Sequence, residues 1–319
     1  MNQGTVGRAG ANGLVRLAVY LAASLIVGGL LTVPVYVALG DAGDTQLDSV
    51  LRRVVTVTAF LLLPLYLAGA ARDRDAVGFG CSRRAFLSAF CAGLALGVLA
   101  VMPLASAFVL LGIRVPAPSV ADTLPQLSAA AAYALVAAAI VGLVEEAYFR
   151  GALMAPLRAL PASAAIAVIA VVYSAVHFVG GPAAGDETAW YSGLASIRRS
   201  EFRIDALLAL AAAGMLLGAM RYRAGHVGLG AGFHAGWVWL MKLNQDYTDA
   251  NAASDLAWLA GSHGGTMGYL GLVWITLLGA AWLLRSRLRA GGSPAGTRPA
   301  APPARRAAPR RPSRPSADR

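Results

Sequence analysis

The chain has 319 residues, of which 57% are hydrophobic and only 13% are charged. Soluble domains carry roughly 25% charged residues, so this composition excludes an ordinary soluble protein and indicates a polytopic membrane protein. The net charge is +11, but +9 of it lies between Arg285 and Arg319, so the rest of the chain is nearly neutral.

Eight apolar segments are long enough to cross a bilayer as helices. The first contains an apolar run of 23 residues, longer than the ~7–15-residue core of a signal peptide, so we expect it to be retained. Short links between the segments favour one membrane bundle over two soluble domains. The predicted spans are residues 15–39, 51–71, 85–112, 127–155, 162–180, 205–222, 226–245 and 267–284.

The distribution of charge predicts the orientation of these spans. If both termini lie in the cytoplasm, 20 of the 27 basic residues fall in cytoplasmic segments, as the positive-inside rule requires. The Pro/Arg/Ala-rich tail should be disordered and lie near anionic lipid. It carries no aromatic or nucleic-acid-binding motif, so we expect no nucleic-acid partner. The predicted fold is therefore an all-α, multi-pass bundle of about eight spans with both termini cytoplasmic.

The fourth span ends in an unusual group of charges, Glu145, Glu146 and Arg150. Ionisable groups at membrane depth are costly, so they are functional candidates by default. Glu146 and Arg150 are four residues apart, which places them on one side of a helix as an ion pair. Glu145 is rotated by about 100° from Glu146, so it can face the bundle as a reactive acid.

Two histidines on later spans are candidate partners for these carboxylates. His177 lies late in the fifth predicted span and shares a helix face with Tyr173. His234 lies in the seventh span among glycine and alanine residues, which permit close helix contact. Depth estimates at ~1.5 Å per residue allow Glu145 and both histidines to converge.

These residues resemble the motifs of the CPBP family, the group of type II CAAX prenyl endopeptidases and bacteriocin-processing or ABI-type membrane proteins. The resemblance covers residues 127–245, and the Glu-Glu-x-x-x-Arg element is its most specific part. Two positions depart from the family pattern. Tyr173 replaces the usual Phe of the second motif. Val238 replaces the usual Asn or Asp four residues after His234, and its side chain cannot hydrogen-bond.

The resemblance implies an intramembrane endopeptidase. Glu145 and His177 would activate water, Glu146 and Arg150 would form a supporting pair, and His234 would stabilise the oxyanion with the help of a polar residue at 238. The indole of Trp237 or the hydroxyl of Tyr173 could take the place of that residue. We favour a reaction without a cofactor, and keep open a divalent metal such as zinc bound by Glu145, His177 and His234.

Three functions remain open from the sequence. The favoured one is cleavage of a membrane-tethered or lipid-modified peptide, with membrane lipids and the peptide as partners. The others are a non-catalytic scaffold or immunity protein, and a proton-coupled transporter. Resemblance and composition predict the bacterial cytoplasmic membrane. The sequence leaves the oligomeric state open. The predicted division is N-terminal helices (1–126), protease-like core (127–245), last loop and span (246–288) and basic tail (289–319).

Overall fold

The computed structural model describes residues 3–39, 46–67, 73–117, 124–181, 187–198, 200, 203–261 and 266–291. The chain divides into two units, Met1–Ala280 and Ala281–Arg319, and the packing reported below is that of the first unit. The predicted basic tail lies outside the described residues, apart from the end of the last helix. The predicted domain limits stay a prediction.

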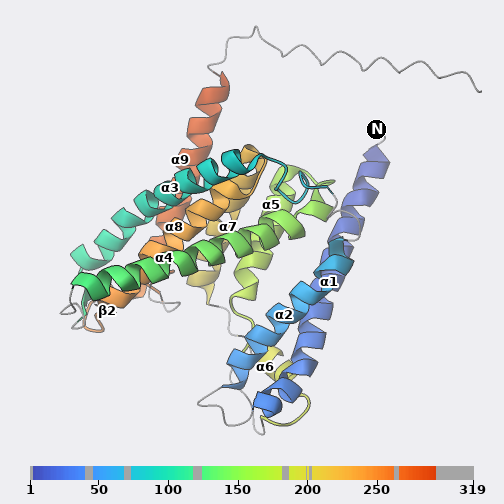
Figure 1. Ribbon diagram of the computed structural model, residues 1–319, viewed down its shortest axis with the longest axis horizontal. Helices are drawn as coiled ribbons and strands as arrows, with labels where there is room; N and C mark the ends of the chain where they lie inside the picture. Colours follow the sequence, from blue (N-terminus) through green and yellow to red (C-terminus); the bar gives the residue numbers. More distant parts are fainter. Residues whose placement is uncertain are drawn as a thin grey trace, which may run out of the picture. The chain divides into compact units, whose positions relative to one another are not determined.

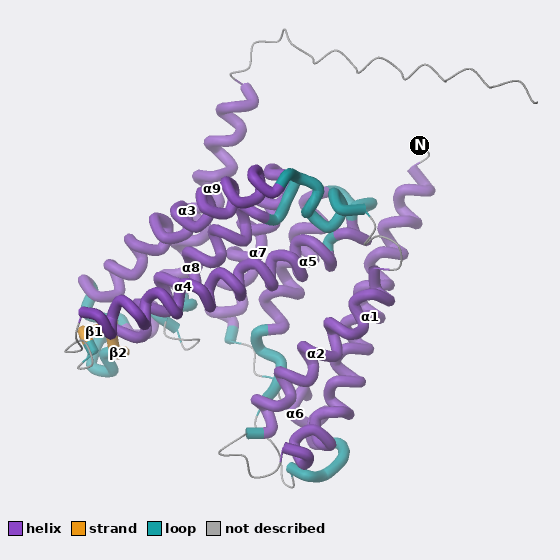
Figure 2. Tube along the Cα trace, in the orientation of Figure 1, coloured by secondary structure: helices purple, strands orange, loops and turns teal. Residues whose placement is uncertain are grey.

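The described residues are helical almost throughout, which confirms the all-α fold (Figures 1 and 2). The helices are α1 (Gln3–Leu39), α2 (Leu47–Leu67), α3 (Arg83–Leu110), α4 (Leu124–Glu146), α5 (Ala162–Val176), α6 (Ser192–Arg198), α7 (Ile204–Ala224), α8 (Gly228–Tyr247) and α9 (Tyr269–Gly291). A π-helical segment (Ala147–Leu153) continues α4, and short 3-10 turns cover Ala155–Leu157 and Ala257–Leu259. Two short strands, β1 (Arg114–Pro116) and β2 (Thr248–Ala250), pair antiparallel with Arg114 opposite Ala250.

Each predicted span coincides with a helix, but the helices differ in length and hydropathy. Within the described residues, five are long and apolar enough to cross a membrane. They are Arg8–Leu39, Leu47–Leu67, Arg83–Leu110, Gln126–Leu157 and Ile204–Ala224. Ala162–Val176 and Tyr269–Arg285 are apolar but shorter. The chain is thus a membrane protein by composition, while the number of spans and the side of the termini stay predictions.

One predicted boundary was wrong: the fifth span was expected to reach residue 180, but α5 ends at Val176. The bounds predicted for the fourth span, 127–155, agree with the apolar segment Gln126–Leu157, although its geometry changes from α to π at Ala147. The polar loop predicted after the fifth span also contains the short helix α6.

Helix α8 is buried on all sides in its first half, because every residue from Gly230 to Trp237 is buried. It lies between α3 and α4 (Figure 1). Its sequence is rich in glycine, contains His234 and ends in polar residues, which explains why α8 is absent from the apolar spans above. His234 thereby sits on the best-covered helix of the bundle.

Small residues allow α3 and α8 to approach closely. A Cβ atom added at Gly232 would lie 1.9 Å from the carbonyl oxygen of Phe90, and one added at Gly93 would lie 2.2 Å from that of Leu229. Gly236 makes an equally close approach, with its added Cβ 2.3 Å from a carbonyl oxygen of α3. Such contacts between backbones depend on the absence of side chains. The position of His234 between these glycines is therefore set by backbone packing.

The π-helical segment is held by tyrosines of α1 and α2. The hydroxyls of Tyr20 and Tyr148 lie 2.8 Å apart, and the Tyr66 hydroxyl donates to the Leu153 carbonyl at 2.8 Å. Single π turns inside helices often mark functional sites. Here the π turn carries the predicted Arg150.

Candidate active site

Glu146 and Arg150 form a buried ion pair, as their spacing predicted. Arg150 Nη1 donates to Glu146 Oε1 at 2.7 Å, and the side chains are 0% and 1% exposed, respectively. Removing two charges from water is costly, and only close pairing offsets that cost. The pair is therefore part of the fold as well as of the site.

His234 joins this pair from α8. Its Nδ1 lies 3.1 Å from Glu146 Oε1, and because an ionised carboxylate can only accept, Nδ1 is the donor. Glu146 thereby fixes the tautomer of the ring. In the neutral ring, Nε2 carries the lone pair and faces the other carboxylate. The bond between Glu146 and His234 was not predicted, because helical spacing pointed only to Arg150 as a partner for Glu146.

Glu145 differs sharply from its neighbour. Its side chain is 31% exposed, and its Oε2 lies 3.9 Å from His234 Nε2, which is too long for a direct hydrogen bond. Among the described residues, Glu145 Oε2 has no hydrogen-bond partner although the atom is buried. The two adjacent acids, predicted to be one paired and one reactive, thus lie in different environments: Glu146 is buried and paired, and Glu145 is partly exposed.

The other face of Arg150 contacts α5 and α7. Its Nη2 donates to the Gly214 carbonyl at 3.3 Å, and its guanidinium carbon lies 4.3 Å from the centre of the Tyr173 ring. The cation over an aromatic face adds an attraction beyond the ion pair. Arg150 therefore connects three helices at one point. The role of Gly214 carries no sequence signal, because the backbone carbonyl acts as the acceptor.

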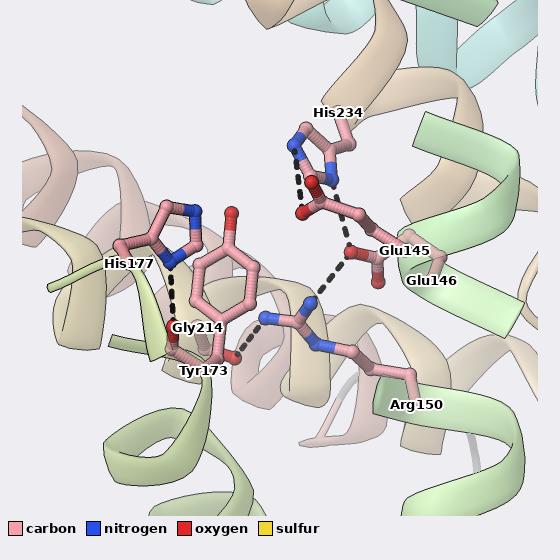
Figure 3. A network of polar contacts seen from close by, with 7 residues as sticks. All are labelled: Glu145, Glu146, Arg150, Tyr173, His177, Gly214 and His234. Carbon is pink, nitrogen blue, oxygen red and sulfur yellow. Dashed lines mark hydrogen bonds and ion pairs between the residues drawn. The ribbon is translucent and has the colours of Figure 1, made fainter. Parts of the chain in front are cut away.

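His177 lies immediately after α5, at its C-cap, rather than inside a helix. Its Nδ1 lies 2.7 Å from the Tyr173 carbonyl oxygen and donates to it, so Nε2 carries the lone pair in the neutral ring. The Tyr173 and His177 rings meet edge to face with centres 4.8 Å apart. Figure 3 shows the Tyr173 hydroxyl directed between the His177 ring and the Glu145–His234 side.

A cavity of about 290 Å³ brings the candidates together. Its lining includes Glu145, Tyr173, His177 and His234. Glu146 and Arg150 are not part of the lining and contact these residues from the protein side. Its other walls are largely apolar and include Trp237, Val238, Leu210, Leu216, Met241 and Ile275. Position 238 thus borders the site, and it presents an apolar side chain there.

His177 also borders a second cavity, of about 670 Å³. Polar and charged side chains of the N-terminal end of α2 line this cavity, among them Gln46, Asp48 and Arg52. The two cavities differ in the character of their walls, and His177 belongs to both.

A metal ion would require its three candidate ligands to lie close together. Across the described parts of the chain, no three His, Cys, Asp or Glu side chains lie together as a metal-binding group. Glu145, His177 and His234 as arranged therefore do not fit a three-ligand metal, and the side chains would have to move to bind one.

One region of the chain matches a known protein family. Residues 127–240 match the family model described as type II CAAX prenyl endopeptidase Rce1-like. No curated protein and no solved structure matches the chain. The match runs from α4 into α8 and so includes all five candidate site residues. The match to this Rce1-like model, over about a third of the chain, supports membership of the CPBP family of membrane proteins.

Proposed function

We propose that the protein is an intramembrane endopeptidase that hydrolyses a peptide bond in a membrane-tethered or lipid-modified peptide. The observation that supports it most is the contrast between the adjacent carboxylates. Glu146 is 1% exposed and bonded to Arg150 and His234, whereas Glu145 is 31% exposed and lines the cavity. One carboxylate thus holds the site together while the other is available to take a proton.

In the proposed reaction, Glu145 is the general base. It takes a proton from water, and the water oxygen attacks the peptide carbonyl carbon. When the C–N bond breaks, the protonated Glu145 returns the proton to the leaving amine. His234 is fixed by Glu146 beside Glu145, and His177 faces the same cavity with a defined tautomer. Glu146 and Arg150 act as positioning residues.

The two cavities suit the two reactants, the peptide and water. The apolar walls of the smaller cavity suit a lipid-embedded peptide, and the polar walls of the larger one offer water a route to His177. We place the protein in the bacterial cytoplasmic membrane, with lipids and the peptide as its partners. We propose that no metal is required.

A Glu145→Gln variant tests this function. In proteoliposomes with candidate membrane-tethered peptides, its cleavage rate should fall about 10²–10⁴-fold, the usual contribution of a general base. Asp73→Asn is the control, because it neutralises an exposed carboxylate in the turn after α2 and should leave cleavage unchanged. Undiminished cleavage by Glu145→Gln would contradict the mechanism.

The cofactor requires a separate measurement. Wild-type protein treated with a chelator and shown to be metal-free by elemental analysis should cleave at its untreated rate. A rate that falls on chelation and returns with zinc would show instead that the donors rearrange around a metal.

A further inference from the structure

The proposed reaction needs a donor for the peptide carbonyl oxygen, and the resemblance implies a polar residue at position 238, where this chain has valine. Hydrolysis passes through a tetrahedral intermediate whose oxyanion must be stabilised by hydrogen-bond donors. Of the two ring nitrogens of His234, Nδ1 is bonded to Glu146 and Nε2 faces Glu145. Val238, which borders the cavity on the same helix, has no polar group to offer.

Trp237 supplies an unused donor at this place. It lines the cavity with Glu145 and His234, follows His234 by three residues on α8, and is 6% exposed. Its indole Nε1 is buried and has no hydrogen-bond partner in the described part of the structure. Buried N–H groups are nearly always bonded, so an unpaired one on a residue that lines this cavity is a candidate donor to a bound substrate.

Two other indoles of the bundle, those of Trp239 and Trp274, show the usual arrangement. Trp239, two residues further along α8, donates to the Ala131 carbonyl at 2.9 Å, and Trp274 donates to the Ala100 carbonyl at 2.6 Å. Both use the N–H group to join neighbouring helices. Trp237 instead packs its ring against Phe233, with centres 6.1 Å apart, and leaves the N–H group unused.

We propose that the Trp237 indole N–H donates to the oxygen of the scissile peptide carbonyl and stabilises the oxyanion, in place of a polar residue at 238. This inference rests on the proposed function. As the water oxygen bonds to the carbonyl carbon and Glu145 takes its proton, the C=O π electrons move onto the oxygen, which then accepts from Nε1. The bond strengthens as charge develops, so it acts on the transition state more than on the bound substrate.

The test is Trp237→Phe, which removes the donor and keeps an aromatic ring. We expect kcat to fall about 100-fold, typical for loss of one oxyanion donor, while KM stays within about twofold. Trp239→Phe is the matched control on the same helix. It should lower thermal stability by removing the bond to Ala131 and leave kcat unchanged. A Trp237→Phe enzyme with wild-type kcat would overturn the assignment, as would an equal loss of kcat in both variants.

A second variant separates donor chemistry from packing. In the double variant Trp237→Phe/Val238→Asn, the new amide places a donor at the neighbouring cavity position, and we expect kcat to recover at least about tenfold. A kcat loss in Tyr173→Phe with Trp237→Phe unaffected would instead assign the role to the tyrosine hydroxyl. Because Glu145→Gln reports on the proposed function itself, an inactive Glu145→Gln with a fully active Trp237→Phe would refute only this inference.

Discussion

The two walls of the active-site cavity are built differently. On one wall, α8 packs backbone to backbone against α3 through glycines and against α4 at Gly142, and a buried polar network joins Glu146, Arg150 and His234. On the other, His177 follows the end of α5 and its Nδ1 is bonded to the carbonyl of its own helix. The first wall is tied to the stability of the fold, whereas the second can be altered at less cost to it. The fold thus holds Glu146, Arg150 and His234 in place more firmly than it holds His177.

The largest expected effect concerns the centre of the first wall. Arg150→Ala leaves Glu146 as an uncompensated buried charge, and we expect it to lower the free energy of unfolding by about 3–5 kcal/mol. Arg158→Ala is the control, because it breaks the solvent-exposed pair with Asp73 and should leave the free energy of unfolding nearly unchanged. Chemical unfolding in detergent measures both. Equal stability of the two variants would show that the network does not support the fold.

The glycine contacts behind His234 come next. Gly232→Ala places a Cβ against the Phe90 carbonyl oxygen, which cannot move without the α3 backbone, so we expect a loss of about 1–3 kcal/mol. Gly279→Ala meets nothing within 4 Å and should be neutral or slightly stabilising. Thermal unfolding compares them. A Gly232→Ala protein as stable as wild type would mean that α3 and α8 can move apart without loss of thermal stability.

Substitution of His234 on the first wall and of His177 on the second tests the difference between the two walls directly. His234→Ala removes a donor from buried Glu146 and should lower the free energy of unfolding by about 1–3 kcal/mol. His177→Ala removes the bond to the Tyr173 carbonyl at a helix end, and we expect a smaller loss. Both should lose cleavage activity. Unfolding and cleavage measured on the same preparations separate the two effects. A larger stability loss in His177→Ala would reverse the assignment of the walls.

The smallest effect lies at the start of α8. Burial, and secondarily Arg221, lowers the pKa of His226, whose Nδ1 accepts the Gly228 N–H at 3.2 Å. Its contribution to stability is therefore full above its unfolded pKa of about 6.5 and is lost as the pH falls towards the lower folded pKa. Thermal unfolding of wild type should weaken slightly between pH 7.5 and 5.5, and His226→Asn should reduce this slope. An unchanged slope would exclude His226 as its source.

The sequence predicted much of the fold because apolar length is a strong signal in membrane proteins. All eight apolar segments are helical, and the Glu146–Arg150 pair follows directly from helical spacing. The π turn was not predicted, since Ala147–Leu153 has no proline and only one glycine, Gly151, and its geometry depends on contacts with α1 and α2. The β1–β2 pair was also missed, because three-residue strands give no periodic pattern.

The sequence predicted which residues form the site better than it predicted the hydrogen bonds between them. Grouping Glu145, His177 and His234 around one cavity agrees with the structure, while their catalytic roles stay predictions. The bond from His234 to Glu146 depends on how α8 is rotated against α4, which the glycines decide and a sequence does not reveal. The unpaired indole of Trp237 could be recognised only after the partners of Trp239 and Trp274 were known.

The local nature of the Glu146–Arg150 pair has a consequence for biosynthesis. The two residues lie on consecutive turns of one segment, whereas Gly214 and His234 follow more than sixty residues later in the sequence. During translation, α4 therefore leaves the ribosome before its distant partners exist. Because Arg150 and Glu146 neutralise each other from within, the segment can enter the bilayer with little net charge from this pair. The later helices then complete a polar centre that was already electrically balanced when it was inserted.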